Sequence, residues 1–366
     1  MSVLIYGDSV RTPALRHEVP VAIGDPFLYL ETNGTRAVTA SALERPRFEE
    51  AGDFELIGLE ELGWDELIAA GRPRWDIELE IAARAVERLG VRDASVPVEF
   101  PVALADRLRS RGIQVRVDHA EFARRRRSKS SAEEAGIRRA QAAADAAMAR
   151  AAESLRGGGS ITSESVRDEM IAVCREHGAT LPADVIVASG AAGAIGHDPG
   201  SGPLREGESI IIDIWPKDDE SACYADMTRT FVIGEVPDEL AEWHRLTQEA
   251  LEATRAAVRP GVDGREIYDI ACEIYEAAGI PTGRAKAEGE VLRDGFFHGL
   301  GHGVGLDVHE EPGLGRSGDE LIAGDVITLE PGTYRQGYGG VRLEDLVLVT
   351  ETGGETLTDF PYGLAP

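Results

Sequence analysis

Four carboxylates interrupt apolar, strand-like runs in the C-terminal half of this chain, and they restrict the folds open to it. They are Asp213, Asp226, Glu330 and Glu344. Acidic residues are depleted in strands, and a buried carboxylate needs a metal ion or a polar partner to offset its desolvation. A surface position or an ion pair explains any one of them. All four together favour strands that surround a shared polar site.

The spacing of these carboxylates predicts two hairpins. Asp213 and Asp226 flank a turn at 216–221, so two adjacent strands would present both side chains. Glu330 and Glu344 flank a glycine-rich turn, which predicts a second hairpin. Each hairpin would then supply one pair of carboxylates.

Histidines accompany the carboxylates along the chain. His298, His302 and His309 lie in one segment with alternating glycines, which disfavour a helix and allow close backbone approach. In an ideal strand His298 and His302 share a face, and a bulge at the glycines would turn His309 inward. A structural role explains any single histidine, but the three together favour a site. Arg342 would share a strand face with Glu344.

The donor types suit a pair of metal ions. Two Asp, two Glu and one His are available: Asp213, Asp226, Glu330, Glu344 and His302. Four carboxylate charges offset two divalent cations, and a mostly oxygen donor set suits Mn²⁺ while also admitting Co²⁺, Fe²⁺ or Zn²⁺. Two metals roughly 3.5–4 Å apart can share a hydroxide and polarise a carbonyl, as in several hydrolases.

The N-terminal part of the chain is typical of a mixed α/β unit, and we find no chemical motif in it. Apolar runs at 27–30 and 37–40 flank an Asn-Gly pair, which predicts a β-hairpin. A basic run at 124–129 favours a solvated hinge, with a local patch that binds an acid or a partner as the alternative.

The segment after this basic run predicts a domain boundary near 124–130. Ser131 and Glu134 match a capping box, and the alanine-rich stretch that follows has strong helix propensity up to Leu155. Two domains are therefore expected, at 1–125 and 126–366.

Composition excludes several classes of function. The chain has 38 Lys plus Arg against 65 Asp plus Glu, a net charge of −27, which argues against a general nucleic-acid binder and against docking on an anionic membrane. The three cysteines form neither a disulfide framework nor a zinc motif. Neither a signal peptide nor an apolar run of membrane length is apparent, so a cytoplasmic location is expected.

The ordered motifs resemble those of the Xaa-Pro peptidases, proline dipeptidase and aminopeptidase P, which share the pita-bread fold of creatinase and methionine aminopeptidase. The motifs lie at 212–214, 224–230, 298–305, 330–334 and 340–345. The resemblance implies an α/β protein in which a small creatinase-like domain precedes a pita-bread domain, with a curved antiparallel sheet and flanking helices. It also implies a homodimer.

The resemblance further implies a dinuclear metal centre, with manganese as the expected metal. Its ligands would be Asp213, Asp226, His302, Glu330 and Glu344. Asp226 and Glu344 would bridge the two ions, and Asp213 would chelate one of them. His302 and Glu330 would bind the other ion.

The same resemblance implies roles around a short, proline-containing peptide. A metal-bridging hydroxide would attack the scissile carbonyl, and Glu330 would take its proton. His309 would hydrogen-bond the carbonyl or tetrahedral oxygen, and His197 would contact the substrate near the scissile nitrogen. His298 and Arg342 would orient the substrate and the residues behind the ligands.

The expected reaction is hydrolysis of the bond between an N-terminal residue and proline, in dipeptides or in longer peptides. Three alternatives stay open: a methionine aminopeptidase-like activity, a small-molecule hydrolase or lyase on the same fold, and a scaffold without catalysis. Methionine aminopeptidases usually lack such an N-terminal domain. Creatinase lacks the metal ligands, and scaffolds typically lose them, whereas all five candidate ligands are present here.

Overall fold

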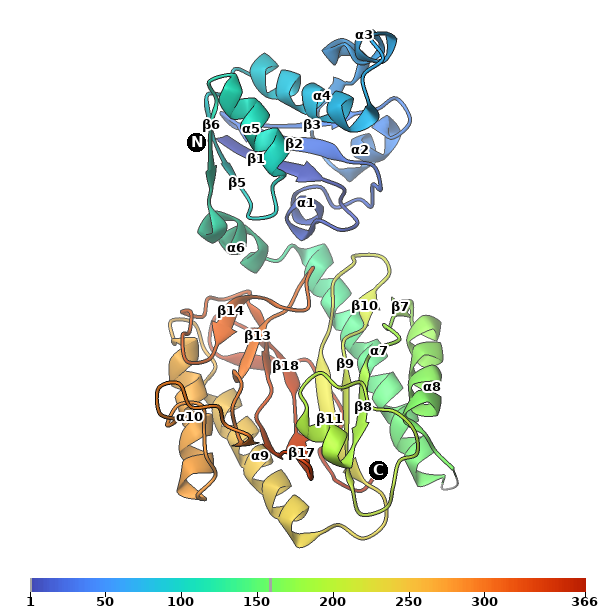
Figure 1. Cartoon of the computed structure of the whole chain (residues 1–366), viewed down its shortest axis with the longest axis vertical. Helices are drawn as coiled ribbons and strands as arrows, with labels where there is room; N and C mark the ends of the chain where they lie inside the picture. Colours follow the sequence, from blue (N-terminus) through green and yellow to red (C-terminus); the bar gives the residue numbers. More distant parts are fainter. Residues whose placement is uncertain (1, 158–159) are drawn as a thin grey trace. The chain divides into compact units, whose positions relative to one another are not determined.

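The computed structural model describes residues 2–157 and 160–366, and it divides the chain into two units, Met1–Arg126 and Arg127–Pro366. Figure 1 shows both units, and each is described by itself below. Of the two, the second unit carries all the candidate site residues.

Unit 1 is built on a six-stranded mixed sheet with the order β4-β3-β2-β1-β5-β6. The strands are β1 Ser2–Gly7, β2 Phe27–Thr32, β3 Thr35–Ala40, β4 Glu55–Gly58, β5 Asp93–Val96 and β6 Gln114–Val117. The helices are α1 Pro13–Glu18, α2 Arg45–Ala51, α3 Trp64–Ala69, α4 Arg74–Arg88, α5 Val102–Ser110 and α6 His119–Arg127, with a 3₁₀ turn at Glu60–Leu62. The predicted hairpin is confirmed as β2–β3. Asn33 and Gly34 form its turn with φ of 51° and 79°, the left-handed values that such a turn requires.

Both faces of the unit 1 sheet are covered, because its central strands are apolar on both sides. On β1, Leu4 packs into a core cluster with residues of α4 and α5. Its neighbours Val3 and Ile5 pack into a second cluster, which includes Leu15 of α1 and Phe48 of α2. Alternate residues of one strand therefore join different cores.

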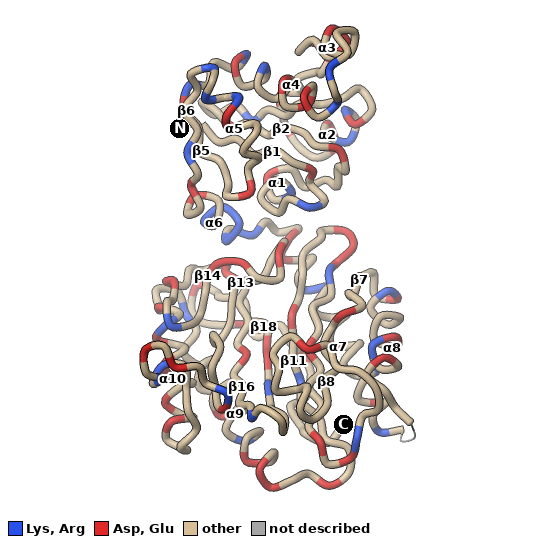
Figure 2. Tube along the Cα trace, in the orientation of Figure 1, with Lys and Arg blue, Asp and Glu red and all other residues tan. Residues whose placement is uncertain are grey.

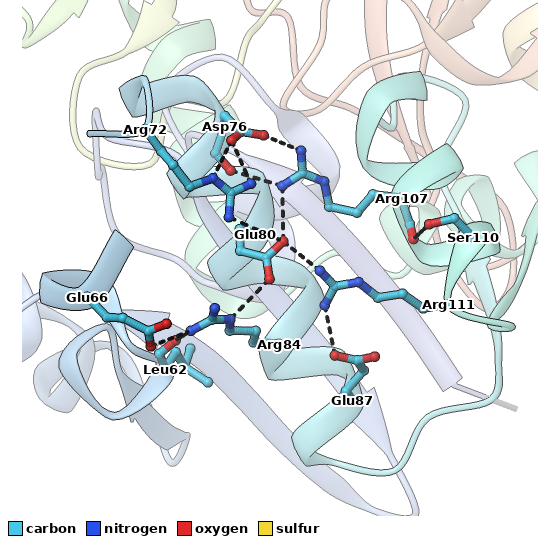
Figure 3. A network of polar contacts seen from close by, with 10 residues as sticks. All are labelled: Leu62, Glu66, Arg72, Asp76, Glu80, Arg84, Glu87, Arg107, Ser110 and Arg111. Atoms are coloured by element: carbon cyan, nitrogen blue, oxygen red, sulfur yellow. Dashed lines mark hydrogen bonds and ion pairs between the residues drawn. The ribbon is translucent and has the colours of Figure 1, made fainter. Parts of the chain in front are cut away.

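A network of arginines and carboxylates ties α4 to α5 (Figure 3). Asp76 accepts hydrogen bonds from Arg72 and Arg107. One turn later, Glu80 accepts from Arg84 at 3.0 Å and from Arg111 at 2.5 Å. Although burial opposes the shift, these arginines hold the pKa of Glu80 below its usual value. The network lies within unit 1, where its ion pairs connect α4 with α5 beside the apolar core.

The basic run at the end of α6 (blue in Figure 2) is engaged in ion pairs. Within unit 1, Arg125 pairs with Glu18 and Glu31, and within unit 2, its first residue Arg127 pairs with Asp325. The arginine side chains are 18% and 15% exposed. A solvated hinge was therefore the wrong interpretation for these two residues, because each guanidinium is largely enclosed by its partners.

Unit 2 consists of two helix pairs that pack on antiparallel strands. The first pair is α7 Ser131–Arg156 and α8 Ser163–Glu176, and the second is α9 Asp238–Ala257 and α10 Gly264–Ala277. The N-cap of α7 is Ser130, which forms a capping box with Glu133. The predicted cap at Ser131 was thus one residue late, since either serine fits the pattern.

The strands of unit 2 lie between these helix pairs in Figure 1. The first half has the sheet β11-β9-β8, with β8 Ile186–Ser189, β9 Ser209–Ile214 and β11 Met227–Val232. The second half has β14-β13-β15-β18-β19, with β13 Gly301–Gly303, β14 Glu310–Leu314, β15 Val326–Leu329, β18 Asp345–Val349 and β19 Gly354–Thr356. Smaller sheets join β12 Asp294–Gly295, β16 Gly332–Arg335 and β17 Gly339–Arg342, and β7 Ala179–Thr180 with β10 Lys217–Asp218. A 3₁₀ segment, η2, spans Gly190–Ala194.

Strand periodicity decides which side chains of β9 face the helices. Ile210, Ile212 and Ile214 belong to the core cluster formed with α7 and α8. Ile211 and Asp213 alternate with them and so point to the other face. That face is turned toward the candidate site. Within the described residues, no helix combines the length and the apolar character that a membrane span requires.

Candidate metal centre and active site

The first half of unit 2 supplies two of the predicted ligands from neighbouring strands. β9 and β11 pair antiparallel, with Asp213 opposite Thr228. Asp226 precedes Thr228 by two residues and shares its face. The first predicted hairpin is therefore confirmed, and both carboxylates line the same cavity.

The second half supplies the other three predicted ligands. His302 lies in β13, Glu330 follows β15, and Glu344 lies between β17 and β18. The second predicted hairpin is confirmed as β16–β17. The Glu344 amide donates to the Thr228 carbonyl at 3.0 Å, which links the two halves beside the site.

All five predicted ligands line one cavity of about 570 Å³. Ligand atoms of Asp226, His302 and Glu344 lie within 4.8 Å of one another. His302 Nε2 is 3.7 Å from a carboxylate oxygen of Asp226 and 3.8 Å from one of Glu330. Asp213 instead accepts a hydrogen bond from Arg342. Side chains more than 110 residues apart in sequence thus meet around one point.

The electrostatics of the cavity call for a cation. Burial raises the pKa of Asp226 and Glu344 well above the usual carboxyl range, and neighbouring carboxylates raise both further. Burial likewise raises the pKa of Glu330 to about 8, with a further rise from Asp213. Asp226 Oδ1 is buried and has no hydrogen-bond partner among the described residues. A divalent ion would stabilise the ionised carboxylates, so this donor set fits one.

His302 is held in the form that binds metals. Its Nδ1 lies 3.1 Å from the carbonyl oxygen of Gly303, so a proton on Nδ1 donates to that oxygen and leaves Nε2 as an acceptor. Burial and the neighbouring His309 lower the pKa of His302 to about 4. The imidazole is therefore neutral at physiological pH, with its free lone pair toward Asp226 and Glu330.

A chain of hydrogen bonds runs from Asp213 to His298. Arg342 donates to Asp213 Oδ2 and, at 3.1 Å, to the Tyr334 hydroxyl. Because a guanidinium only donates, the Tyr334 hydroxyl donates in turn to His298 Nε2 at 2.9 Å. His298 Nδ1 then donates to the carbonyl of Gly299 at 2.7 Å. Both ring nitrogens of His298 are thus occupied, and burial lowers its pKa to about 4.

The glycine-rich histidine segment contains the expected irregularity, and it turns His309 toward the cavity. β13 covers only Gly301–Gly303, its register shifts between His302 and Gly303, and the chain then turns back so that β14 pairs with β13. This turn brings the rings of His302 and His309 to 4.3 Å between centroids, edge to face. The glycines allow a sharper reversal than a bulge in one strand. His197, after η2, lines the same cavity.

Several cavity residues had no predicted role. They are Asp184, Ile186, Trp215, Phe297, Val308 and Tyr334. One of them carries a signal that strand periodicity reveals once β9 is assigned: Trp215 lies two residues beyond Asp213, on the same face. Tyr334 lies in the motif at 330–334, but its contacts with Arg342 and His298 depend on the tertiary structure.

The fold and this cavity define a metallopeptidase, and comparison with known proteins agrees. Residues 135–351 match the model of metallopeptidase family M24. The chain is 32% identical over 92% of its length to a probable dipeptidase, PepE, of Mycobacterium tuberculosis, and the match covers 84% of that protein. The Xaa-Pro dipeptidase of Pyrococcus furiosus is 36% identical over 50% of this chain and 49% of its own. The chain therefore belongs to metallopeptidase family M24.

The solved structures bear out the fold class. The prolidase from Pyrococcus horikoshii superposes with a TM-score of 0.79 at 25% identity, over 99% of this chain and 95% of that one. The predicted resemblance to the Xaa-Pro peptidases, the α/β pita-bread fold and the expectation of a metallo-exopeptidase are thus confirmed. Use of divalent metal follows from the family.

Proposed function

We propose that this metallopeptidase hydrolyses the bond between an N-terminal residue and proline in short peptides, with two divalent metal ions. The observation that carries the proposal is that all five predicted ligands line one cavity. The printed names of relatives, a probable dipeptidase and an Xaa-Pro dipeptidase, support the same substrate class.

The five side chains divide naturally between two ions. Asp226 and Glu344, whose ligand atoms lie within 4.8 Å of each other and of one of His302, would be the carboxylates shared by both ions. Asp213 would complete one site, and His302 with Glu330 the other. The bound ions would activate water and polarise the scissile carbonyl. Manganese is the metal we propose, with cobalt, zinc or iron as alternatives that suit the same donors.

The remaining polar residues act on protons and on orientation. Glu330 would take the proton of the attacking water and pass it on, because its carboxylate lies in the cavity beside the other ligands. His309, next to His302, would donate to the carbonyl oxygen as charge develops there. His197 would contact the substrate near the scissile nitrogen.

Arg342 and His298 would orient the site from behind it. Arg342 holds Asp213 directly, and through Tyr334 it fixes the ring of His298. His298 would therefore shape the cavity by its ring, since both of its nitrogens are engaged.

Apolar walls give the cavity a surface for proline. Ile186, Trp215, Phe297 and Val308 line it together with the polar residues. The proline ring is apolar, and its nitrogen carries no hydrogen when it forms a peptide bond. An apolar pocket can therefore bind the ring without burying an N–H group that lacks a hydrogen-bond acceptor.

One competition experiment tests the substrate class. Manganese-loaded protein is incubated with an Xaa-Pro dipeptide, an Xaa-Pro-Xaa tripeptide and a Met-Ala-Xaa tripeptide, and mass spectrometry identifies the products. Cleavage of either proline peptide, abolished in Glu330→Gln, supports the proposal, and the peptide consumed shows the preferred length. Methionine release would indicate a methionine aminopeptidase. No cleavage by metal-loaded protein would favour small-molecule chemistry, and no metal binding would favour a scaffold.

The quaternary state and location remain part of the proposal. We propose a homodimer in the cytoplasm that binds neither nucleic acid nor membrane. Light scattering of the purified protein measures its mass, and elemental analysis counts the metal ions per chain.

A further inference from the structure

A buried ion pair connects the segment before α7 with the residue that follows His309. The Lys129 ammonium donates to Oε1 of Glu310. The two side chains are 6% and 2% exposed. Replacing a buried ion pair with apolar residues is often neutral or stabilising for the fold. Stability alone therefore does not explain this pair, and we consider which residues it holds in position.

The backbone of Glu310 is adjacent to His309 in sequence and pairs with the residue that follows His302. Glu310 is the first residue of β14, and it pairs with Gly303 in β13. Gly303 follows His302, and Glu310 follows His309. A displacement of the Glu310 side chain would therefore shift His309 relative to its partner ring, which now lies 4.3 Å away.

Gly305 leaves the space that this ion pair occupies. A Cβ at Gly305 would collide with the Glu310 carboxylate and with the Lys129 ammonium. The Gly305 carbonyl accepts from the Tyr224 amide at 2.8 Å, two residues before Asp226. The turn between the two histidines thus contacts both the ion pair and the segment that leads to the candidate ligand Asp226.

The other end of the ion pair is attached to a rigid element. Lys129 immediately precedes Ser130, whose capping box with Glu133 begins the 26-residue helix α7. Because α7 packs against β9 and β11, its start is fixed relative to the first half of unit 2. The ion pair therefore links the His309 segment to the half of unit 2 that supplies Asp213 and Asp226.

We propose that Lys129 and Glu310 are positioning residues that set the His309 ring over the substrate. The inference rests on the proposed function, in which His309 contacts the scissile carbonyl oxygen. Misplacement of a reacting group by about 1 Å costs on the order of 100-fold in rate, so loss of the pair should lower kcat much more than it changes KM.

The test removes both charges together, because a single substitution would leave a buried charge unpaired. The double variant Lys129→Met with Glu310→Gln is compared with the matched pair Arg127→Met with Asp325→Asn, which removes another enclosed ion pair from the same segment. We expect kcat to fall at least about 10-fold in the first pair and to stay within about twofold in the second. Metal content and KM should change little in both, and Lys129→Arg should retain most of kcat.

Crystal structures of the first double variant and the wild type provide a readout that does not depend on cleavage. We expect the His309 ring to be displaced from His302 in the double variant. An unmoved ring, a kcat within about twofold of the wild type, or loss of folding in the double variant would each overturn the inference. Failure of the wild type to cleave any proline peptide would instead overturn the proposed function, and the ring position would still decide this inference.

Discussion

Arg342 donates a hydrogen bond to the carboxylate of Asp213, so a residue from one half of unit 2 holds a candidate ligand from the other half. The Arg342 side chain is 5% exposed and also contacts Tyr334. The planar guanidinium donates to the two partners from separate nitrogens, Nη1 to Tyr334 and Nη2 to Asp213, a fixed fork that the single nitrogen of an ammonium does not reproduce. This contact connects substrate orientation to the geometry of the ligands.

We therefore predict that Arg342→Lys is strongly impaired although it keeps the charge. Lysine lacks the second arm that reaches Tyr334, so His298 would lose its fixed orientation. kcat/KM on an Xaa-Pro peptide should fall about 100-fold, which is about 2.7 kcal/mol of transition-state stabilisation. Steady-state kinetics at saturating manganese measure the change. Tyr334→Phe serves as the comparison, and near-normal kinetics in both variants would contradict the assigned role.

Metal binding should release protons at neutral pH. In the metal-free protein the pKa of Glu330 is about 8, so the folded chain keeps a proton that a bound cation would displace. The apparent metal affinity should rise as the pH increases from about 5 to 8. Isothermal titration in buffers of different ionisation enthalpy counts the protons. A binding enthalpy that is independent of the buffer at pH 6.5 would argue against this coupling, and Glu330→Gln should reduce the count.

The stability of the metal-free protein should fall over the same pH range. The folded pKa of Glu330 is raised above its ordinary value of 4.5, so its contribution to the free energy of unfolding is fully present below pH 4.5. That contribution is lost as the pH rises through about 8. Urea unfolding with a chelator present, from pH 5 to pH 8.5, measures the trend. Glu330→Gln should flatten it, whereas an unchanged slope in that variant would assign the trend to other groups.

Arg229 should be among the most important residues for stability. It is 1% exposed and donates to the Asp345 carboxylate at 3.0 Å and to the backbone carbonyls of Thr228 and Glu344. Arg229→Met would remove the buried cation that pairs with the Asp345 carboxylate and one donor from each carbonyl, at a cost of about 3–5 kcal/mol. Arg245→Met, which removes exposed helical ion pairs on α9, should change stability by at most about 0.5 kcal/mol. Urea unfolding compares the two, and equal losses would contradict the prediction.

Asp184 should influence which N-terminal residues are accepted. Asp184 is an exposed residue that lines the cavity, as Ile186 does, and it is not one of the candidate ligands. A negative charge there attracts a basic side chain, so Asp184→Asn should lower the kcat/KM ratio of Lys-Pro over Leu-Pro peptides about threefold to fivefold. Asp168→Asn, an exposed carboxylate on the outer helix α8, is the control. An unchanged ratio in Asp184→Asn would remove this residue from substrate selection.

Local patterns account for the parts of the fold that sequence reasoning anticipated. The Asn33-Gly34 turn needs two left-handed residues, which that pair adopts at little cost. The Asp213 strand alternates between a helix-covered face and a cavity face, so period-two reasoning places its carboxylate correctly. For His298 to His309, the expected irregularity at the glycines is present between His302 and Gly303, and His309 does face the cavity. The reversal into β14 that follows was not expected, because glycines leave the backbone free to turn and only tertiary pairing selects the turn.

The ordered motifs were enough to identify the pita-bread fold and the family through their resemblance to the Xaa-Pro peptidases, since each motif consists of residues close together in the chain. Tertiary structure decided how the site works. Arg342 with Asp213 and Lys129 with Glu310 are 129 and 181 positions apart. No local pattern specifies such pairs, because they form only when strands and helices pack. The raised pKa of Glu330 and the lowered pKa of His302 have the same origin, since both shifts depend mainly on burial in the cavity.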